Sequence, residues 1–231
     1  MPSPHFLPLP SQCEVCRQWD RAALCSHCIT RFAQAVPRCG RCGLRMGLAA
    51  QACGSCQREP PPFESCCSVA DYSFPWDRLI VAFKFEGRLE LATALASALH
   101  GAVQSQGRPA PGLVLPVPLS PQRLAERGYN QAWELARRVA RATGTPARAD
   151  VLLRPGETAH QAELSRAQRQ TNLRRAFMVD PRLRPALAGR SVALVDDVMT
   201  TGATVREAAT VLLRAGAAAV HVWVVARTPE H

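Results

Sequence analysis

One stretch constrains the fold of this chain more than any other: residues 191–204, which read SVALVDDVMTTGAT. Its apolar run, residues 192–195, is typical of a strand that is buried on both faces. Asp196 and Asp197 follow this run, and a small polar turn then leads into apolar residues at helical spacing. The stretch therefore predicts a strand, an acidic pair, a turn and a helix. In open α/β sheets ligands bind at the carboxyl ends of strands, so we expect a ligand site here.

The turn over residues 200–204 has the chemistry of an anion site. Small residues that enter a helix leave backbone N–H groups free, and the helix dipole attracts negative charge. Gly202 allows close approach of a phosphate, and Thr201 and Thr204 add hydroxyl donors. Two carboxylates beside this turn suit sugar hydroxyls or a bound Mg²⁺, so the combination describes a ribose 5-phosphate group. The alternative is an ordinary strand-turn-helix with a capping Thr, which leaves the acidic pair unexplained.

Residues 192–204 resemble the phosphoribosyl-pyrophosphate (PRPP) motif of the type I phosphoribosyltransferases, which has apolar residues, two acids and a Thr/Gly loop in this order. The stretch is not a Walker P-loop, because it lacks Gly-Lys-Ser/Thr. The resemblance implies that Asp196 and Asp197 hold the ribose hydroxyls and that Mg²⁺ accompanies PRPP. It assigns the 5-phosphate to the residues of the turn: Thr200, Thr201, Gly202, Ala203 and Thr204.

Four CxxC pairs lie at the start of the chain. Each pair offers two thiolates on one tight turn, and two pairs can close a tetrahedral Zn²⁺ site, so two structural zinc sites are predicted. Pairing of neighbours is the simplest assignment, and an alternating pairing stays open. Disulfides or a redox CxxC are the alternatives, which four repeats in a reducing compartment disfavour. The predicted metal ligands are Cys13, Cys16, Cys25, Cys28, Cys39, Cys42, Cys53 and Cys56, whereas Cys66 and Cys67 are expected to be buried thiols.

The net charge of the chain favours acidic partners. It is +10 over 231 residues, and Lys84 is the single lysine, so nearly all of the positive charge is arginine. Such a balance suits nucleic acid or phosphorylated metabolites. No apolar run approaches the length of a membrane helix, so no membrane insertion is expected. The first residues lack the regions of a signal peptide, and we expect a cytoplasmic, reduced protein.

The remaining segments predict an α/β domain with a mainly parallel sheet, over residues 63–231, after a double zinc ribbon over residues 1–62. Further buried strands are expected at residues 68–74, 112–118, 147–153 and 219–226. Helical spacing over residues 77–103 is broken at Gly87, and a helix that starts after Ser120 is interrupted near Gly128.

Basic and polar side chains near these breaks are candidates to bind phosphates. Lys84 and Arg88 flank Gly87, and Arg127, Asn130 and Gln131 follow a predicted strand, where a pyrophosphate could be held. The alternative for Lys84 and Arg88 is a solvated helix end. Residues 154–177 are basic and too long for a plain connection, which predicts a functional flap that includes Arg169.

The order of these motifs resembles the ComF competence family. The motifs are four CxxC pairs, FKFEGR, PVPLSPQRLAERGYNQA, a basic flap with QAELSRAQRQTNLRRAF, and VDDVMTTGAT. The resemblance covers nearly the whole chain. It implies a double zinc ribbon joined to a phosphoribosyltransferase domain, in a cytoplasmic protein that handles incoming single-stranded DNA, with a competence helicase or a recombination protein as a candidate partner.

Two classes of function follow from this resemblance. The first is a phosphoribosyltransferase that uses Mg²⁺ and PRPP, with an acceptor that is left open; its catalytic candidates are Asp196, Asp197, Arg127, Lys84 and Arg169. The second is a non-catalytic, PRPP-responsive accessory that binds single-stranded DNA. A third alternative is a regulator that docks through its zinc ribbons and would need a sequence-specific DNA site, but no helix-turn-helix is evident.

Overall fold

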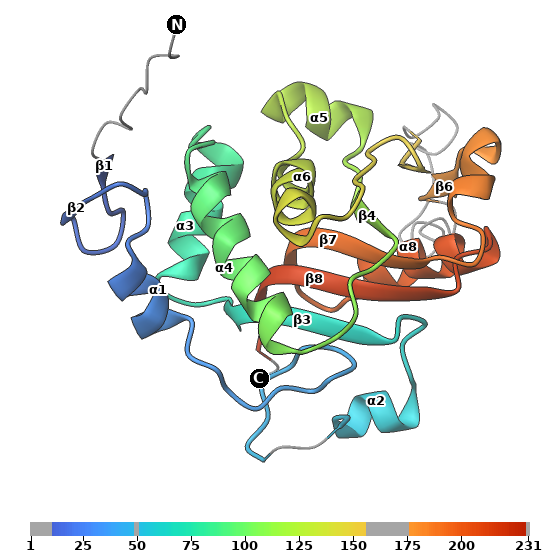
Figure 1. Cartoon of the computed structure of the whole chain (residues 1–231), viewed down its shortest axis with the longest axis horizontal. Coiled ribbons are helices and arrows are strands. Elements are labelled where there is room, and N and C mark those ends of the chain that lie inside the picture. Colours follow the sequence, from blue (N-terminus) through green and yellow to red (C-terminus); the bar gives the residue numbers. More distant parts are fainter. Residues whose placement is uncertain (1–10, 49–50, 156–175, 230–231) are drawn as a thin grey trace, which may run out of the picture.

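A four-stranded parallel sheet forms the centre of the molecule (Figure 1). The computed structural model describes residues 11–48, 51–155 and 176–229. The strand order is β3-β8-β7-β4, with β3 at Ser65–Asp71, β8 at Ala219–Arg227, β7 at Ser191–Met199 and β4 at Leu113–Pro116. All neighbouring pairs are parallel, and the strands consist largely of buried apolar residues. The predicted α/β class with a mainly parallel sheet is confirmed.

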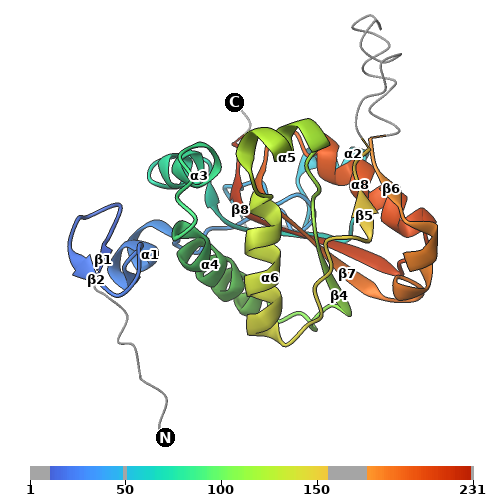
Figure 2. The ribbon, with the colours of Figure 1, turned by 90° about the horizontal axis from the view of Figure 1, so that it is seen from above.

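Helices cover both faces of the sheet (Figures 1 and 2). On one face, α4 (Leu91–Ser105) and α6 (Gln131–Thr143) pack against the strands, with α3 (Trp76–Phe85) beside α4. On the other face lies α8 (Ala203–Arg214). The alternation of β7 separates the two cores: Ala193 and Val195 belong to the core of α4 and α6, and Val192 and Leu194 to that of α8.

Local sequence signals explain where the helices begin and end. Gly87 adopts a left-handed φ of 68° between α3 and α4, which confirms the predicted break. The helix α5 (Pro121–Arg127) begins after Ser120, whose hydroxyl accepts a hydrogen bond from the Arg123 amide at 3.3 Å. It ends at Gly128, with φ of 80°, and α6 then begins after its cap Asn130. The predicted interruption near Gly128 is therefore also confirmed.

The predicted buried strand over residues 147–153 is wrong in extent and in partner. Ala147 makes only a single parallel bridge with Val114 of β4. The chain then leaves the sheet, and β5 (Leu152–Leu153) pairs antiparallel with β6 (Met178–Val179) in a separate ribbon. The physical reason is the charged pair Arg148–Asp150, 2.6 Å apart, which stays at the surface. A 3-10 helix, Pro181–Ala186, leads from β6 toward β7.

The cysteine-rich segment contacts the rest of the chain at two places, at α3 through Phe32 and Trp76 and at β3 through Gly40 and Cys66. It contains β1 (Ser11–Gln12), β2 (Trp19–Asp20), α1 (Ser26–Phe32) and α2 (Gly54–Arg58). Because its cysteines contribute to both cores, no separate core among the described residues marks the predicted boundary at residue 62, which stays a prediction. In the ranges that the structure describes, no helix combines the length and the apolar character needed to cross a membrane.

Candidate functional site

The acidic pair lies within β7 rather than after it, because β7 continues to Met199 alongside β8. Asp197 is only 2% exposed, and its Oδ1 lies 2.8 Å from Lys84 Nζ at the end of α3. The amide of Val198 also donates to this oxygen, at 2.7 Å. Within the described ranges, the buried Oδ2 of Asp197 has no hydrogen-bond partner. A buried carboxylate oxygen without a donor is costly, so this atom is an acceptor available to a ligand.

Asp196 sits one residue earlier on the strand and is half-buried. Its Oδ1 accepts a hydrogen bond from the Asp197 amide at 2.8 Å. Burial, and next the charge of Asp197, hold the pKa of Asp196 well above its usual range. A cation or a donor group at this position would lower that pKa again, which is the behaviour expected of a ligand-binding acid.

The turn after β7 joins directly to the first turn of α8. Gly202 caps this helix with a left-handed φ of 80°, and the Ala203 amide lies 3.3 Å from Thr201 Oγ1. Thr200, Thr201 and Thr204 are exposed. The first amides of α8 have no partner within the helix, so exposed hydroxyls and free backbone donors occur side by side.

A cavity of about 430 Å³ is connected to Asp197 through Lys84 and contains two of the predicted basic residues. Arg127 lines it from the end of α5, and its guanidinium lies 4.9 Å from the centre of the Phe85 ring. Lys84 lines it from α3, so one cation both contacts Asp197 and faces the cavity. The complete lining is Lys84, Phe85, Gly87, Leu119, Arg123, Glu126, Arg127, Tyr129 and Gln131. The structure thus brings together residues from three separate sequence motifs.

Two polar residues suggested for pyrophosphate binding have structural partners instead. Arg88 forms ion pairs with Glu14 and Glu90. Asn130 caps α6, since its Oδ1 accepts from the Ala132 amide at 2.9 Å and its Nδ2 donates to the Val117 carbonyl at 3.1 Å. Arg169 of the predicted flap lies outside the described residues.

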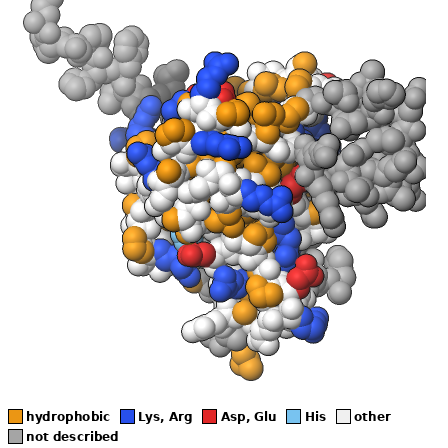
Figure 3. Space-filling model, turned by 90° about the vertical axis from the view of Figure 1, so that its right-hand side faces the viewer, with side chains coloured by type: hydrophobic (Ala, Val, Ile, Leu, Met, Phe, Trp, Pro, Cys, Tyr) orange, Lys and Arg blue, Asp and Glu red, His pale blue; other side chains and the backbone are white. Residues whose placement is uncertain are grey.

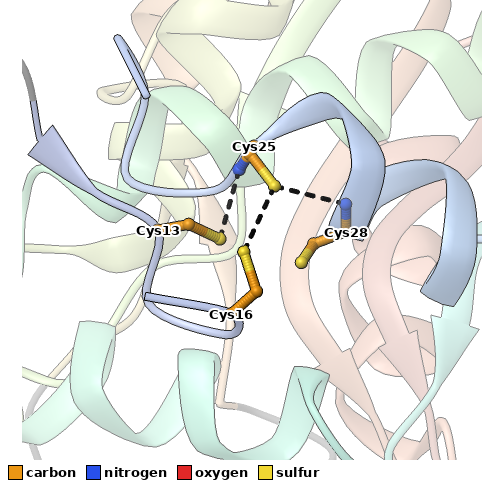
Figure 4. Close-up of side chains that lie close together, drawn as sticks. All are labelled: Cys13, Cys16, Cys25 and Cys28. Carbon is orange, nitrogen blue, oxygen red and sulfur yellow. Dashed lines mark hydrogen bonds between the residues drawn. The ribbon is translucent and has the colours of Figure 1, made fainter. Parts of the chain in front are cut away.

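The first four cysteines form one cluster and the next four form another. In each, the four sulfur atoms lie within 4.8 Å of one another, which confirms the pairing of neighbouring CxxC motifs. Figure 4 shows the thiols of the first cluster converging from the loop after β1 and from α1. Cys16 and Cys25 Sγ are 3.7 Å apart, as are Cys42 and Cys53 Sγ. Tetrahedral zinc with bonds of about 2.3 Å requires sulfurs about 3.8 Å apart, so both clusters fit this metal.

The backbone around each cluster favours thiolate ligands. Burial opposes ionisation of Cys13, but amides of Cys16, Cys25 and Val15 outweigh it and lower the pKa of the Cys13 thiol to about 6. The same balance lowers the pKa of Cys39 to about 7. Thiolates are the form that binds metal, so the lowered pKa favours the metal-binding form of the first cysteine in each cluster. All ten cysteines are free thiols, and Cys66 and Cys67 are buried, as predicted.

Comparisons with known proteins agree with this combination of clusters and sheet. The family model for the phosphoribosyl transferase domain matches residues 134–231. The chain is 38% identical over 233 residues to "DNA utilization protein YhgH" of Salmonella typhi, covering 96% of this chain and 100% of that protein. It is 35% identical to "Competence protein F" of Haemophilus influenzae, covering 88% of this chain and 90% of that protein. It is 31% identical to "Competence protein ComFC" of Bacillus subtilis, covering 66% of this chain and 59% of that protein. The chain belongs to the ComF family.

Sequence reasoning missed several residues that shape the site of this ComF-family chain. Tyr129 donates its hydroxyl hydrogen bond to the Phe83 carbonyl near the end of α3, and the two rings lie 6.0 Å apart. Tyr129 thereby holds the Lys84 end of α3 next to the loop that follows α5. Phe85 and Arg123 line the cavity as well. Tyr129 and Phe85 lie within the motifs RGYNQ and KFEGR, in which the sequence predicts phosphate binding only for the charged and amide side chains.

Magnesium also fits the donors at the acidic pair of this ComF-family chain. Carboxylate oxygens are ligands that Mg²⁺ prefers, and Asp197 Oδ2 has no partner among the described residues. Mg²⁺ usually retains several waters and shares its remaining positions between one or two carboxylates and a substrate phosphate.

Proposed function

We propose that this chain binds Mg²⁺–PRPP at the carboxyl end of β7 and transfers its phosphoribosyl group to an acceptor. The observation that carries the proposal is the position of Asp197. Its orphaned carboxylate oxygen is buried at a strand end, beside a Thr/Gly turn that opens a helix. Ribose hydroxyls would donate to this oxygen, while the turn of residues 200–204 would hold the 5-phosphate. The match to the phosphoribosyl transferase domain over residues 134–231 supports this assignment.

In such a transfer the acceptor atom forms a bond to C1′ of the ribose as the bond from C1′ to the pyrophosphate oxygen breaks. The electron pair of that bond leaves with pyrophosphate, and positive charge develops on the ribose ring in an oxocarbenium-like state. Asp196 and Asp197 would stabilise this positive charge. Mg²⁺, when bound, supplies neutralisation of phosphate charge.

The cavity of Lys84 and Arg127 would receive the departing pyrophosphate. Both residues line it, and their fixed positive charges meet the charge that develops on the leaving group. Lys84 also neutralises Asp197, so it links the two halves of the site. Arg169 would add a further charge from the flap.

Calorimetric titration of Mg²⁺–PRPP into the zinc-loaded protein tests this site. We expect binding by the wild type and none by the double variant Asp196→Asn/Asp197→Asn. Asp150→Asn is the matched control, because this exposed acid pairs with Arg148 away from the site. Pyrophosphate release in a screen of acceptors then tests catalysis. Absence of PRPP binding by the wild type would remove the function proposed here.

We also propose a link to the handling of DNA, which the names of the relatives support. "DNA utilization protein" and "Competence protein" describe proteins that match this chain over most of its length. This chain would therefore act on incoming single-stranded DNA, with a competence helicase or a recombination protein as its partner.

A second candidate function, a non-catalytic accessory that binds single-stranded DNA, is favoured by three arginine–aromatic pairs. The guanidinium lies 5.2 Å from the ring centre in Arg31–Phe32, 5.7 Å in Arg78–Phe74 and 4.9 Å in Arg127–Phe85. Phe74 and Phe85 are more than half exposed. Bases stack on such rings while arginines contact phosphates. On another side of the molecule, basic side chains are spread widely, with few acidic ones among them (Figure 3).

Salt dependence tests the direct binding of single-stranded DNA that this accessory requires. Binding of single-stranded DNA through phosphates is expected to weaken steeply as the salt concentration rises. The variant Phe74→Ala/Phe85→Ala is expected to weaken it further, and exposed Leu48→Ala is the control. Affinity that ignores ionic strength, or no DNA binding at all, would contradict this role.

A further inference from the structure

Arg227 is a buried cation at the junction of the second cysteine cluster, the sheet and the proposed phosphate turn. It is the last residue of β8 and pairs with the last residues of both neighbouring strands, Asp71 of β3 and Met199 of β7. Its side chain is 4% exposed. A buried charge is costly unless it is compensated by hydrogen bonds.

The guanidinium of Arg227 is compensated by backbone carbonyls from three parts of the chain. Its Nε donates to the Cys42 carbonyl, in the second cluster, at 3.1 Å. One terminal nitrogen donates to the carbonyls of Met199 at 3.3 Å and of Thr200, where the turn begins, and to that of Thr228 at 2.7 Å. Hydrogen bonds from a charged donor are stronger than neutral ones, so one side chain firmly connects the turn to residues 39–43, the knuckle of the second cluster.

The knuckle of the second cluster is held firmly on the sheet, which makes this connection stiff. The Cys66 amide of β3 donates to the Gly40 carbonyl at 3.0 Å. Gly43 lies so close that a Cβ there would come within 2.9 Å of Cys66 Sγ. Arg38 donates to the Gly43 carbonyl at 3.1 Å and to Asp71 at 2.6 Å. A change in the knuckle would therefore move the Cys42 carbonyl that Arg227 binds.

We propose that Arg227 is a positioning residue that couples zinc binding at the second cluster to the conformation of the turn over residues 200–204, and thereby to the affinity for PRPP. The last step rests on the function proposed above. With zinc bound, the Cys42 carbonyl is fixed and Arg227 holds the Met199 and Thr200 carbonyls in place. Without zinc, the knuckle loosens and the turn loses this support. The first cluster belongs to the other core, beside α3, and has no such contact in the described part of the chain.

Amide hydrogen exchange of the turn, measured on the full chain without PRPP, tests the coupling directly. Cys53→Ser removes a half-buried ligand of the second cluster, and Cys16→Ser removes an exposed ligand of the first as the matched control. We expect faster exchange over residues 199–204 in Cys53→Ser and in Arg227→Lys, but not in Cys16→Ser. Unchanged exchange in well-folded Cys53→Ser and Arg227→Lys would overturn the proposal, whether or not PRPP binds.

Reciprocal linkage supplies a second measurement that a merely structural arginine would not affect. If zinc strengthens PRPP binding, PRPP must retain zinc to the same degree. In Cys16→Ser, which leaves the second cluster intact, saturating Mg²⁺–PRPP is expected to slow zinc release to a chelator by about fivefold or more. Cys16→Ser/Arg227→Lys is expected to lose this effect, and equal slowing in both variants would overturn the proposal. If PRPP does not bind at all, the proposed function fails, while hydrogen exchange still decides the coupling.

Discussion

The two cysteine clusters share one ligand set and one sulfur geometry, yet they contact different parts of the molecule. The first cluster, Cys13 to Cys28, lies in the core on the α4 side of the sheet, and the second, Cys39 to Cys56, in the core on the α8 side. Around the first, the Trp76 indole donates to the Phe32 carbonyl at 2.9 Å and Arg88 pairs with Glu14. These contacts lead to α3, which carries Lys84.

The second cluster contacts the ends of three strands instead, through Arg38 and Arg227. One cluster therefore supports the cationic side of the proposed site and the other supports its phosphate turn. The comparison teaches that a repeated metal motif acquires its role from the surface on which it packs, because the ligands themselves are the same.

The largest expected effect is the loss of one metal at a time. Cys28→Ser and Cys56→Ser each remove a buried ligand, so each should lose one zinc and several kcal/mol of stability. Metal analysis and thermal unfolding measure this, with Cys67→Ser, a buried cysteine outside the clusters, as the control that keeps both zinc ions. Loss of both ions from either single variant would show that the clusters are not independent.

A smaller effect is expected at Asp197, which pairs with Lys84 of α3. Asp197→Asn leaves Lys84 without its charged partner in a buried setting, which should cost about 3 kcal/mol in the free energy of unfolding. PRPP binding and pyrophosphate release should be lost as well. Urea unfolding and calorimetry measure the two effects, and unchanged turnover in this variant would remove Asp197 from the proposed site.

The docking contacts of the two clusters should differ in strength. Arg38 and Asp71 are both about 15% exposed, so water screens their ion pair little. Arg38→Ala should therefore lower the free energy of unfolding by about 2 kcal/mol. Arg88 is 37% exposed beside Glu14, so solvent screens that pair and Glu14→Gln should cost about 0.5 kcal/mol. Chemical denaturation of both variants gives the comparison. Equal costs would mean that the second cluster is no more firmly docked than the first.

The smallest expected effect is a dependence of stability on pH that arises from Asp196. Its pKa in the folded protein is well above the usual value, first because of burial and next because of Asp197. Below the pKa of the unfolded chain both states carry the proton. As the pH rises from there toward the folded pKa, the unfolded chain releases the proton and the folded protein keeps it, so stability falls.

Asp196→Asn removes this pH-dependent loss of stability. The free energy of unfolding of the variant, relative to wild type, should therefore grow as the pH rises from the unfolded pKa of Asp196 toward its folded pKa. Unfolding by urea at a series of pH values measures the difference, with Asp150→Asn as the control. A difference that shrinks with rising pH would show that the ionised acid is stabilised in the folded state.

The fold was largely predictable because its signals are local. The apolar runs of β4, β7 and β8, the caps Ser120 and Asn130, and the left-handed glycines act over a few neighbouring residues. The segment after Ala147 was mispredicted because its short apolar stretch also suits a two-residue ribbon, and the choice depended on its distant partner β6. The same limit hid Tyr129, whose hydroxyl binds a carbonyl of another helix.

By itself, the sequence determined the ComF-like order of motifs, the four CxxC pairs and the acidic pair before its Thr/Gly turn, since spacing along the chain carries these signals. Only the tertiary structure decided that Lys84 reaches Asp197 and that the two clusters belong to different cores. It alone placed Arg227 between Cys42 and Thr200. The physical reason is that these contacts join residues far apart in sequence. Some of them are also made to backbone carbonyls, which every residue has, so the amino-acid sequence does not indicate them.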